Sequence, residues 1–233
     1  HGINNAYAVI RNKNQAATNY VEGYFMPLRS AIEYLAQKPE VINAVKHDQS
    51  QKQHALSLFK IHHHSLPNIN YVYSGYKDRT LLINDYTPPE NYNPKKRPWY
   101  EAALQAAPDI SGGIPYKEAK TGEWLVSLSK VLTDKEGNLQ GVVAVDASID
   151  AVTKNLFERD LTYSSSYSYV VDKEGSVIIH HRKDLLGKKI TDLVTTRHSI
   201  VNRTGHSSYD FEDKSKIAYH THLPSLGWTV VTV

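Results

Sequence analysis

The chain contains no cysteine among its 233 residues, which excludes disulfide frameworks and metal sites built on thiolates. It also lacks the roughly 18 consecutive apolar residues that a membrane-spanning helix requires. The N-terminus has neither the basic start nor the apolar run of a signal peptide. Because the sequence begins at His1 and stops in the apolar run GWTVVTV, we expect it to be a domain excised from a longer protein.

A large surplus of either charge is also missing. The chain carries 27 Lys and Arg against 24 Asp and Glu, and no basic run is dense enough for nucleic-acid binding. Tyrosine, in contrast, is abundant, with 16 Tyr against 4 Phe. Because a tyrosine ring packs like a hydrophobic group while its hydroxyl needs a hydrogen-bond partner, this excess predicts amphipathic surfaces and polar pockets.

The first part of the chain has the periodicity of a helix. Apolar residues recur every three or four positions, which predicts a long N-terminal helix within residues 1–47. Pro27 lies inside this stretch, so we expect a kink or a break into two segments there. A second helix is predicted over residues 49–63.

From Ile69 the period changes to two, which is typical of β-strands. Strands are predicted in INYVYSGY, TLLIND, WLVSLSKVL and QGVVAVDAS, and a connecting helix is predicted over residues 148–161. The order then repeats in SYSYVVDKEGSVIIHH, a short helical segment KDLLGKKITDLV, HSSYDFED, KIAYHTHL and GWTVVTV. This repetition predicts an α+β fold in which a long N-terminal helix (1–47) precedes two antiparallel β-sheet modules (48–161 and 162–233).

Residues 92–100, YNPKKRPWY, combine three large aromatic rings with three positive charges and two prolines. A buried strand does not accommodate the charges, and a solvated loop gains little from the rings. We therefore interpret this segment as one wall of a binding site.

The order of elements resembles the plan of the double Cache (dCache_1) family of bacterial extracytoplasmic sensor domains, which carry two tandem PAS-like modules. The segment KKRPWYEAA, followed by SGGIPY, GEWLVSLSKVL and GVVAVDAS, is similar to the strands and loops that form the membrane-distal pocket of that family. The resemblance covers essentially the whole chain. It implies a periplasmic sensor domain of an inner-membrane protein, with membrane spans flanking this fragment.

The resemblance also implies that the domain is not an enzyme and that it needs no cofactor. The parent protein would be a chemoreceptor, a diguanylate cyclase or a histidine kinase. Two copies are expected to pair through the N-terminal helix, and no nucleic-acid partner is expected. The alternatives are an extracytoplasmic metal-binding protein or hydrolase, and a sensor for a simple amine or carboxylate.

A subset of the family recognises free amino acids through six positions, which resemble Tyr92, Arg97, Trp99, Tyr100, Tyr116 and Asp146 of this sequence. These six residues are the predicted ligand-binding site in the distal module. All six residue types occur in the order that the resemblance requires.

The chemistry of a free amino acid fits these residue types. Such a ligand carries a carboxylate and an ammonium a few bonds apart, so its pocket needs one fixed cation and one fixed anion. Arg97 offers a planar fork for the carboxylate, and Asp146 can accept from the ammonium. The hydroxyls of Tyr92 and Tyr116 can accept the remaining ammonium protons, and the Trp99 indole can donate to the carboxylate.

Each of these residues also has a purely structural interpretation. Arg97 could be a surface cation stacked on an aromatic ring. Asp146 could cap a helix that starts near Ser148. Trp99 and Tyr100 would point to opposite faces if their segment is extended, so that only one of them enters the pocket.

Clustered histidines favour a metal site as the rival function. His62 to His64 are consecutive, and His180 adjoins His181, but ligand pairs on a helix are normally four residues apart. His220 and His222 would share a strand face, although no third ligand is evident. No metal site is therefore predicted. The signatures GxSxG, GxxxxGK and GxGxxG are absent from the sequence.

Overall fold

The computed structural model describes residues 2–46, 49–66, 68–158 and 166–233. The chain forms two compact units. The central unit consists of residues 27–148, and the terminal unit combines residues 1–26 with residues 149–233. The N-terminal helix therefore contributes to both units, whereas the predicted boundaries set it apart from both modules.

Helix α1 extends from Gly2 to Ala36 and contains Pro27, so the alternative of a break at that residue is wrong. Two residues after the end of the helix, Lys38 precedes Pro39 and adopts an extended backbone, as a residue before proline prefers. Pro39 then occupies the first turn of the short helix α2 (Pro39–Ile42). Helix α3 (Gln49–Ser65) confirms the second predicted helix.

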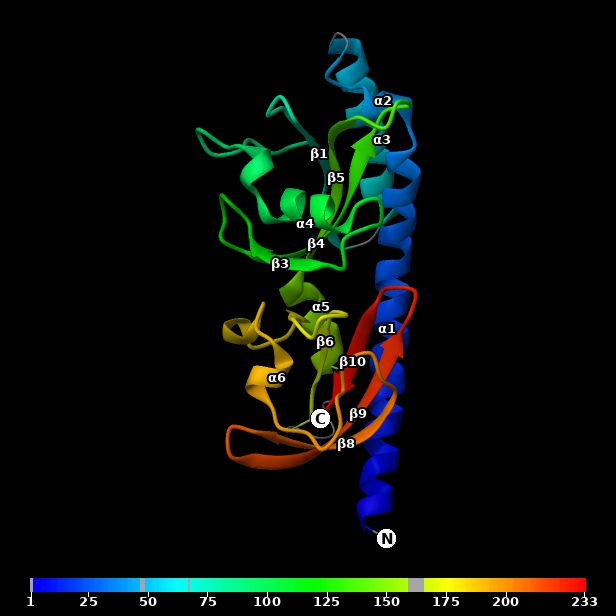
Figure 1. Ribbon diagram of the computed structural model, residues 1–233, viewed down its shortest axis with the longest axis vertical. Helices are drawn as coiled ribbons and strands as arrows, with labels where there is room; N and C mark the ends of the chain where they lie inside the picture. The colour runs from blue at the N-terminus through cyan, green and yellow to red at the C-terminus, as the bar shows by residue number, and fades with distance from the viewer. Residues whose placement is uncertain (1, 47–48, 67, 159–165) are drawn as a thin grey trace. The chain divides into compact units, whose positions relative to one another are not determined.

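The central unit contains a five-stranded antiparallel sheet with the strand order β2-β1-β5-β4-β3 (Figure 1). Its strands are β1 (Ile69–Tyr76), β2 (Leu81–Ile83), β3 (Ile114–Lys117), β4 (Trp124–Thr133) and β5 (Leu139–Ser148). The antiparallel pairs β1–β2 and β4–β5 are hairpins built from strands predicted in INYVYSGY and TLLIND and in WLVSLSKVL and QGVVAVDAS. Strand β5 lies at the centre of the sheet, and all of its residues after Leu139 are buried.

The segment that carries the aromatic and basic residues is helical. Pro94–Lys96 forms the 3₁₀ helix η1, and Pro98–Ala106 forms helix α4 with Pro98 in its first turn. The extended conformation considered for Trp99 and Tyr100 is therefore wrong. A Cβ atom at Gly75 of β1 would lie 2.7 Å from both Pro94 and Trp99, so this close packing requires glycine.

The terminal unit contains a second five-stranded antiparallel sheet, with the order β7-β6-β10-β9-β8. Its strands are β6 (Ser168–Val171), β7 (Val177–Ile179), β8 (Gly205–Phe211), β9 (Lys214–Leu223) and β10 (Trp228–Thr232). The predicted short helical segment forms two turns, η2 (Lys183–Leu185) and α6 (Ile190–Leu193). The long N-terminal helix and the two antiparallel sheets that follow it in the sequence confirm the predicted α+β fold class.

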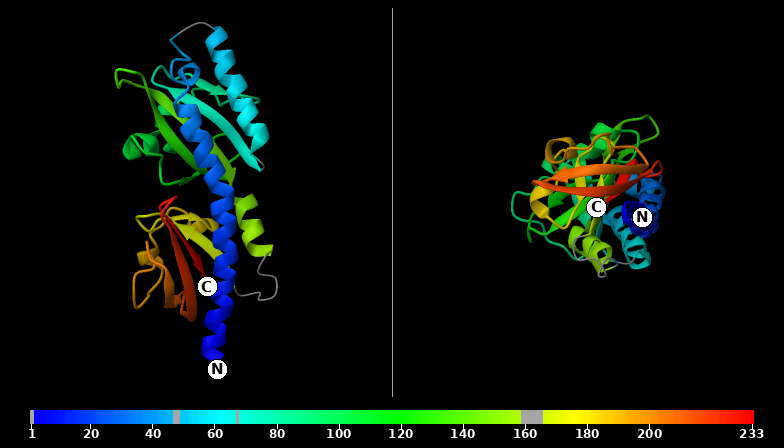
Figure 2. Two further views of the ribbon diagram at one scale, coloured as in Figure 1. Left: turned by 90° about the vertical axis from the view of Figure 1, so that its right-hand side faces the viewer. Right: turned by 90° about the horizontal axis from the view of Figure 1, so that it is seen from below.

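Helix α1 packs along the strands of this second sheet (Figure 2). The amide of Asn14 is fully buried and donates to the backbone carbonyls of Tyr219 on β9 and Val230 on β10. Further along the helix, Phe25 packs edge-on against Trp228, with ring centroids 4.8 Å apart. These contacts fix the first turns of α1 to the terminal unit.

Helix α5 (Ile149–Glu158) matches the predicted connecting helix, whose last residues, 159–161, lie outside the described part of the chain. None of the described helices is both long enough and apolar enough to span a bilayer.

Candidate ligand-binding site

A small cavity of about 20 Å³ lies at the central sheet, against strands β1, β3 and β5. Four of the six predicted site residues line it: Tyr92, Arg97, Tyr116 and Asp146. They come from the segment before η1, the start of α4, strand β3 and strand β5. The fold thus brings together residues that are up to 54 positions apart in the sequence.

Asp146 is the buried anion of this cavity, with 1% of its surface exposed. Its Oδ1 accepts a hydrogen bond of 2.8 Å from the Tyr73 hydroxyl, and its Oδ2 accepts one of 2.5 Å from the Tyr116 hydroxyl. Burial raises the pKa of Asp146 to about 7, while these hydrogen bonds act in the opposite direction. The carboxyl group is therefore poised to ionise near neutral pH.

The interpretation of Asp146 as a helix cap is wrong. The residue lies inside strand β5, where it pairs with Tyr71 of β1 and Ser127 of β4. Helix α5 begins only at Ile149, and both carboxylate oxygens of Asp146 already accept tyrosine hydroxyls. The side chain faces the cavity.

Arg97 is the cation of the cavity and is held at the start of helix α4. Its Nη2 donates a hydrogen bond of 2.8 Å to the backbone carbonyl of Lys117. The guanidinium carbon lies 5.5 Å from the ring centroid of Tyr116 and 6.0 Å from that of Tyr92. Among the described residues, none accepts a hydrogen bond from its buried Nε. Arg97 stacks on aromatic rings, as the structural alternative required, but it does so in the wall of the cavity.

Trp99 and Tyr100 do not line the cavity. Trp99 is 1% exposed, packs edge-on against Tyr73 at 4.8 Å, and its side chain hydrogen-bonds Tyr92. Tyr100 belongs to the same buried cluster, beside Ala103. Trp99 therefore contacts the cavity-lining residues Tyr73 and Tyr92 from the core side, and Tyr100 packs in the core.

The cavity wall also contains residues that were not predicted, and those among them with polar side chains are Tyr71, Tyr73, Tyr86 and Glu118. Tyr71 and Tyr73 are two residues apart on β1 and share one face, which the period-two pattern in INYVYSGY could have indicated. Tyr86 donates a very short hydrogen bond to Glu118. Burial works against ionisation of Glu118, but hydrogen bonds from Tyr86 and from the Thr121 and Lys120 backbone outweigh it and lower its pKa.

The comparisons with known proteins agree with this geometry. Residues 3–233 match the dCache_1 family, described as a Cache domain. The chain belongs to the Cache domain family. This confirms the family that the segments KKRPWYEAA and GVVAVDAS predicted. The Cache domains of its chemotaxis relatives are extracytoplasmic, ligand-binding sensor domains and not enzymes.

Two curated relatives of this Cache domain are methyl-accepting chemotaxis proteins. McpB of Bacillus subtilis is 27% identical over 143 residues, which cover 61% of this chain and 20% of that protein. McpA of Pseudomonas putida is 30% identical over 105 residues, which cover 45% of this chain and 16% of that protein. This chain therefore spans about one fifth of the length of the relatives that it matches.

Solved structures show the same fold. The ligand-binding domain of the amino acid chemoreceptor PctB from Pseudomonas aeruginosa, in complex with L-Arg, has a TM-score of 0.72 and 21% identity. That match covers 97% of this chain and 93% of the other. The ligand-binding domain of CtaA from Pseudomonas fluorescens, in complex with L-isoleucine, has a TM-score of 0.68 and 21% identity. It covers 98% of this chain and 94% of the other.

Several of the clustered histidines of this Cache domain take part in hydrogen bonds or ring contacts. His220 is buried, and its Nε2 lies 3.0 Å from the Ser207 hydroxyl while its Nδ1 contacts the Arg203 carbonyl. The Nδ1 of His222 lies 3.2 Å from the Trp228 carbonyl. Within the described part of the chain, no three His, Asp or Glu side chains are grouped as metal ligands.

Proposed function

We propose that this chain is the periplasmic ligand-binding domain of a bacterial transmembrane chemoreceptor, and that its central unit binds a free amino acid. Asp146 accepts from the ligand ammonium, and Arg97 binds the ligand carboxylate. The hydroxyls of Tyr116 and Tyr92 complete the polar wall. Trp99 holds the Tyr92 hydroxyl in place, and Tyr100 supports the site through the core.

One observation carries this proposal: a fully buried carboxylate and an arginine with a buried, unused Nε face the same cavity. Burying the ionised form of Asp146 is unfavourable, as its raised pKa indicates. Without a positively charged partner, the ionised carboxylate therefore destabilises the folded chain. An ammonium supplies that partner. The Nε of Arg97 similarly lacks an acceptor, which a carboxylate supplies.

The cavity must open to admit such a ligand. Its volume of about 20 Å³ holds little more than one water molecule. The hydrogen bond between Tyr86 and Glu118 joins the segment after β2 to the segment after β3, and both residues line the cavity. We expect these two segments to separate on ligand entry, and the cost of this opening to reduce the apparent affinity.

The assignment to a chemoreceptor is supported by the methyl-accepting chemotaxis proteins among the relatives. In this proposal, ligand binding shifts a population between two arrangements, and α1 and β10 carry the difference towards the membrane. The full-length sequence should then contain membrane spans on both sides and a methyl-accepting signalling module. Pairing of two copies through α1 is a further prediction, which light scattering with and without ligand would check.

A thermal-shift screen tests the proposed ligand class. We expect at least one L-amino acid to raise the melting temperature by several degrees, because saturation at about 100 times Kd contributes roughly 2.7 kcal/mol. The corresponding decarboxylated amine and des-amino acid should give much smaller shifts. A shift produced by zinc and reversed by EDTA, with none from any amino acid, would replace this proposal by a metal site.

A further inference from the structure

The two sheets, drawn in Figure 1, have the same strand order, and the register between their strands allows positions of one sheet to be equated with positions of the other. In the central sheet, Tyr71 of β1 lies opposite Asp146 of β5. At the corresponding place in the terminal sheet, Tyr167 lies opposite Val233, and the two residues exchange backbone hydrogen bonds of 3.1 and 3.0 Å. Position 146 of one unit therefore corresponds to position 233 of the other.

The tyrosines of the central cavity recur at the equated positions. Two residues further along the same face, Tyr73 corresponds to Tyr169. Strands β4 and β9 occupy the same place in the two sheets. Following the strand pairing through them shows that Tyr116 of β3 corresponds to Tyr209 of β8. The hydroxyl oxygens of Tyr73 and Tyr116 are 3.2 Å apart, and those of Tyr169 and Tyr209 are 2.9 Å apart. Both sheets therefore hold the same pair of hydroxyls in the same geometry.

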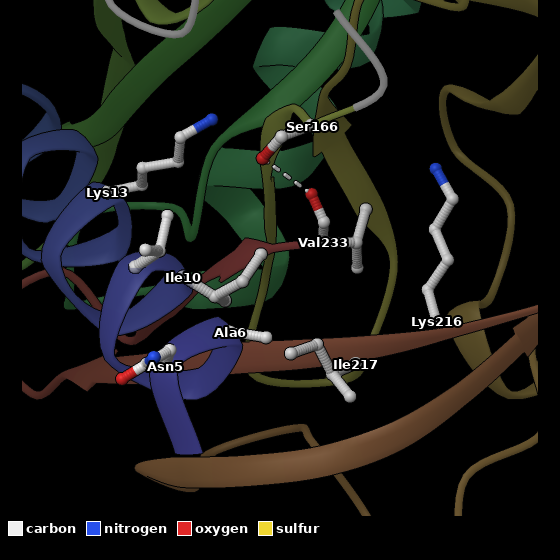
Figure 3. Close-up of a pocket in the computed structure, with 9 residues that line it drawn as sticks. Asn5, Ala6, Ile10, Lys13, Ser166, Lys216, Ile217 and Val233 are labelled. Carbon is white, nitrogen blue, oxygen red and sulfur yellow. Dashed lines mark hydrogen bonds between the residues drawn. The ribbon is translucent and has the colours of Figure 1, made fainter. Parts of the chain in front are cut away.

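The charged residues do not recur. Asp146 is replaced by Val233, whose side chain is buried and which also borders a larger, mainly apolar cavity of about 460 Å³ beside Ile10 of α1 (Figure 3). Leu125, the partner of Tyr116, is replaced by Lys216, the partner of Tyr209. The carboxylate that would hold an ammonium is thus lost, and a cation is gained on the same face of the sheet.

A cavity of about 160 Å³ lies against these residues, with Tyr167, Tyr209 and Lys216 in its wall. The Nζ of Lys216 lies 5.4 Å from the ring centroid of Tyr167. Burial and the neighbouring Lys214 lower the pKa of Lys216. Additional negative charge would therefore be favourable at this position.

A second cation borders the same cavity. Arg182 forms ion pairs of 2.8 Å with Glu212 and with Asp184, and its guanidinium carbon lies 5.5 Å from the ring centroid of Phe211. These pairs fix the orientation of Arg182. The wall of the cavity contains three cationic side chains, those of Arg182, Lys214 and Lys216, and one carboxylate, that of Glu212.

The tyrosine hydroxyls supply a hydrogen-bond donor. Tyr169, Tyr209 and Tyr167 are in hydrogen-bonding contact one after another. A chain of three hydroxyls uses two of its protons internally and leaves the third for an outside acceptor. In the central unit, the corresponding hydroxyls of Tyr73 and Tyr116 are directed to Asp146 instead.

We propose that this cavity of the terminal unit binds a small organic carboxylate that carries no ammonium group. Lys216 and Arg182 provide the positive charge, the tyrosine chain donates to a carboxylate oxygen, and the rings of Tyr167 and Phe211 cover the hydrocarbon part of the ligand. This site is independent of the amino-acid site proposed for the central unit.

Calorimetry with propionate and with propylammonium, each on the purified chain of residues 1–233, tests this proposal. We expect propionate to bind and propylammonium not to bind. Lys216→Met keeps the length of the side chain but removes its charge, and should weaken propionate binding by about tenfold or more. Lys173→Met, at an exposed turn of the same unit, is the matched control and should leave propionate affinity within about twofold.

A second variant keeps the test decisive if Lys216→Met does not fold. Arg182→Gln removes the second positive charge that the proposal assigns to this cavity and should also weaken propionate binding by about tenfold. Absence of propionate binding at about 10 mM in the parent chain would overturn the proposal. So would propionate binding that Arg97→Ala removes and Lys216→Met retains, because it would place the ligand in the central unit.

Discussion

The central unit holds a carboxylate between two tyrosine hydroxyls, whereas the terminal unit brings two equivalent hydroxyls together without one. The strand order and register are the same, so the difference arises from Asp146 in one sheet and Val233 in the other. Asp146 supplies the buried carboxylate of the central cavity, whereas Arg182, Lys214, Lys216 and Glu212 supply the charges in the wall of the terminal cavity. In a repeated fold, the shared frame does not by itself determine the ligand.

The two units also respond to pH in opposite directions. Burial raises the pKa of Asp146 to about 7 in the central unit, and burial lowers the pKa of His180 to about 3 in the terminal unit. The contribution of Asp146 to stability is present at low pH and is lost as pH rises towards 7. His180 stays neutral in the folded chain, whereas in the unfolded chain it is protonated below about pH 6.5. It therefore lowers the stability of the folded chain at low pH, and this loss disappears above about pH 6.5. Effects of pH on the whole chain therefore partly cancel, and variants are needed to separate them.

The largest expected effect is on the stability of the ligand-free chain. Asp146→Asn removes the ionisable group and preserves its size, so it should raise stability at pH 8 by about 4 kcal/mol relative to the parent. This corresponds to a melting temperature higher by on the order of 10 °C. Near pH 4 the difference should almost vanish, and Asp109→Asn, at an exposed position of the same unit, should give no comparable gain in stability at pH 8. A constant difference across this range would contradict the buried, neutralised state of Asp146.

The next effect is the pH dependence of amino-acid affinity. Only ionised Asp146 can pair with the ligand ammonium, so affinity should fall about tenfold between pH 8 and pH 6, given a pKa of about 7. Binding near pH 7 should release protons, which calorimetry in buffers with different ionisation enthalpies measures directly. Propionate binding to the terminal unit has no such carboxylate to ionise. An amino-acid affinity that is unchanged between pH 6 and pH 8 would show that Asp146 does not hold the ammonium.

The smallest effect distinguishes the equivalent tyrosines. Tyr73→Phe removes one donor to Asp146 and should weaken amino-acid binding roughly fivefold, or about 1 kcal/mol. Tyr169→Phe removes the equated hydroxyl from the terminal unit and should leave amino-acid affinity within about twofold. Titration of both variants with the same amino acid checks this prediction. Equal losses in the two variants would contradict the division of roles between the sheets.

Much of the fold could be predicted from the sequence, because the period-two segments are long and are separated by clear turns. Strands β1, β4 and β9 fall where INYVYSGY, WLVSLSKVL and KIAYHTHL predicted them, whereas the short edge strand β3 was not predicted from periodicity. Helix α4 was missed, although Pro98 in its first turn and Glu101 near its start are helix signals.

The candidate site could be predicted only in part. Arg97 and Asp146 were predicted from the resemblance to the amino-acid-binding subset of the family, and the structure places both in the wall of one cavity. Two other contacts depend on the packing of α4 against β1: the hydrogen bond of Trp99 with Tyr92 and that of Tyr73 with Asp146. The equivalence of Asp146 with Val233 depends on the register between two paired strands in each sheet. Such pairing is not encoded in any local stretch of sequence.

The most direct test of the central claim is calorimetric titration with one amino acid, its decarboxylated amine and its des-amino acid. The parent chain, Arg97→Ala and Asp146→Asn are each titrated with all three ligands. Both variants should weaken amino-acid binding by well over tenfold, because removing one member of a buried charge pair costs about 2 to 5 kcal/mol. Arg97→Ala should affect the amine far less, and Asp146→Asn should affect the des-amino acid far less. If both variants keep the amino-acid affinity within about threefold of the parent, or roughly 0.65 kcal/mol, then Arg97 and Asp146 do not bind the ligand and the account is contradicted.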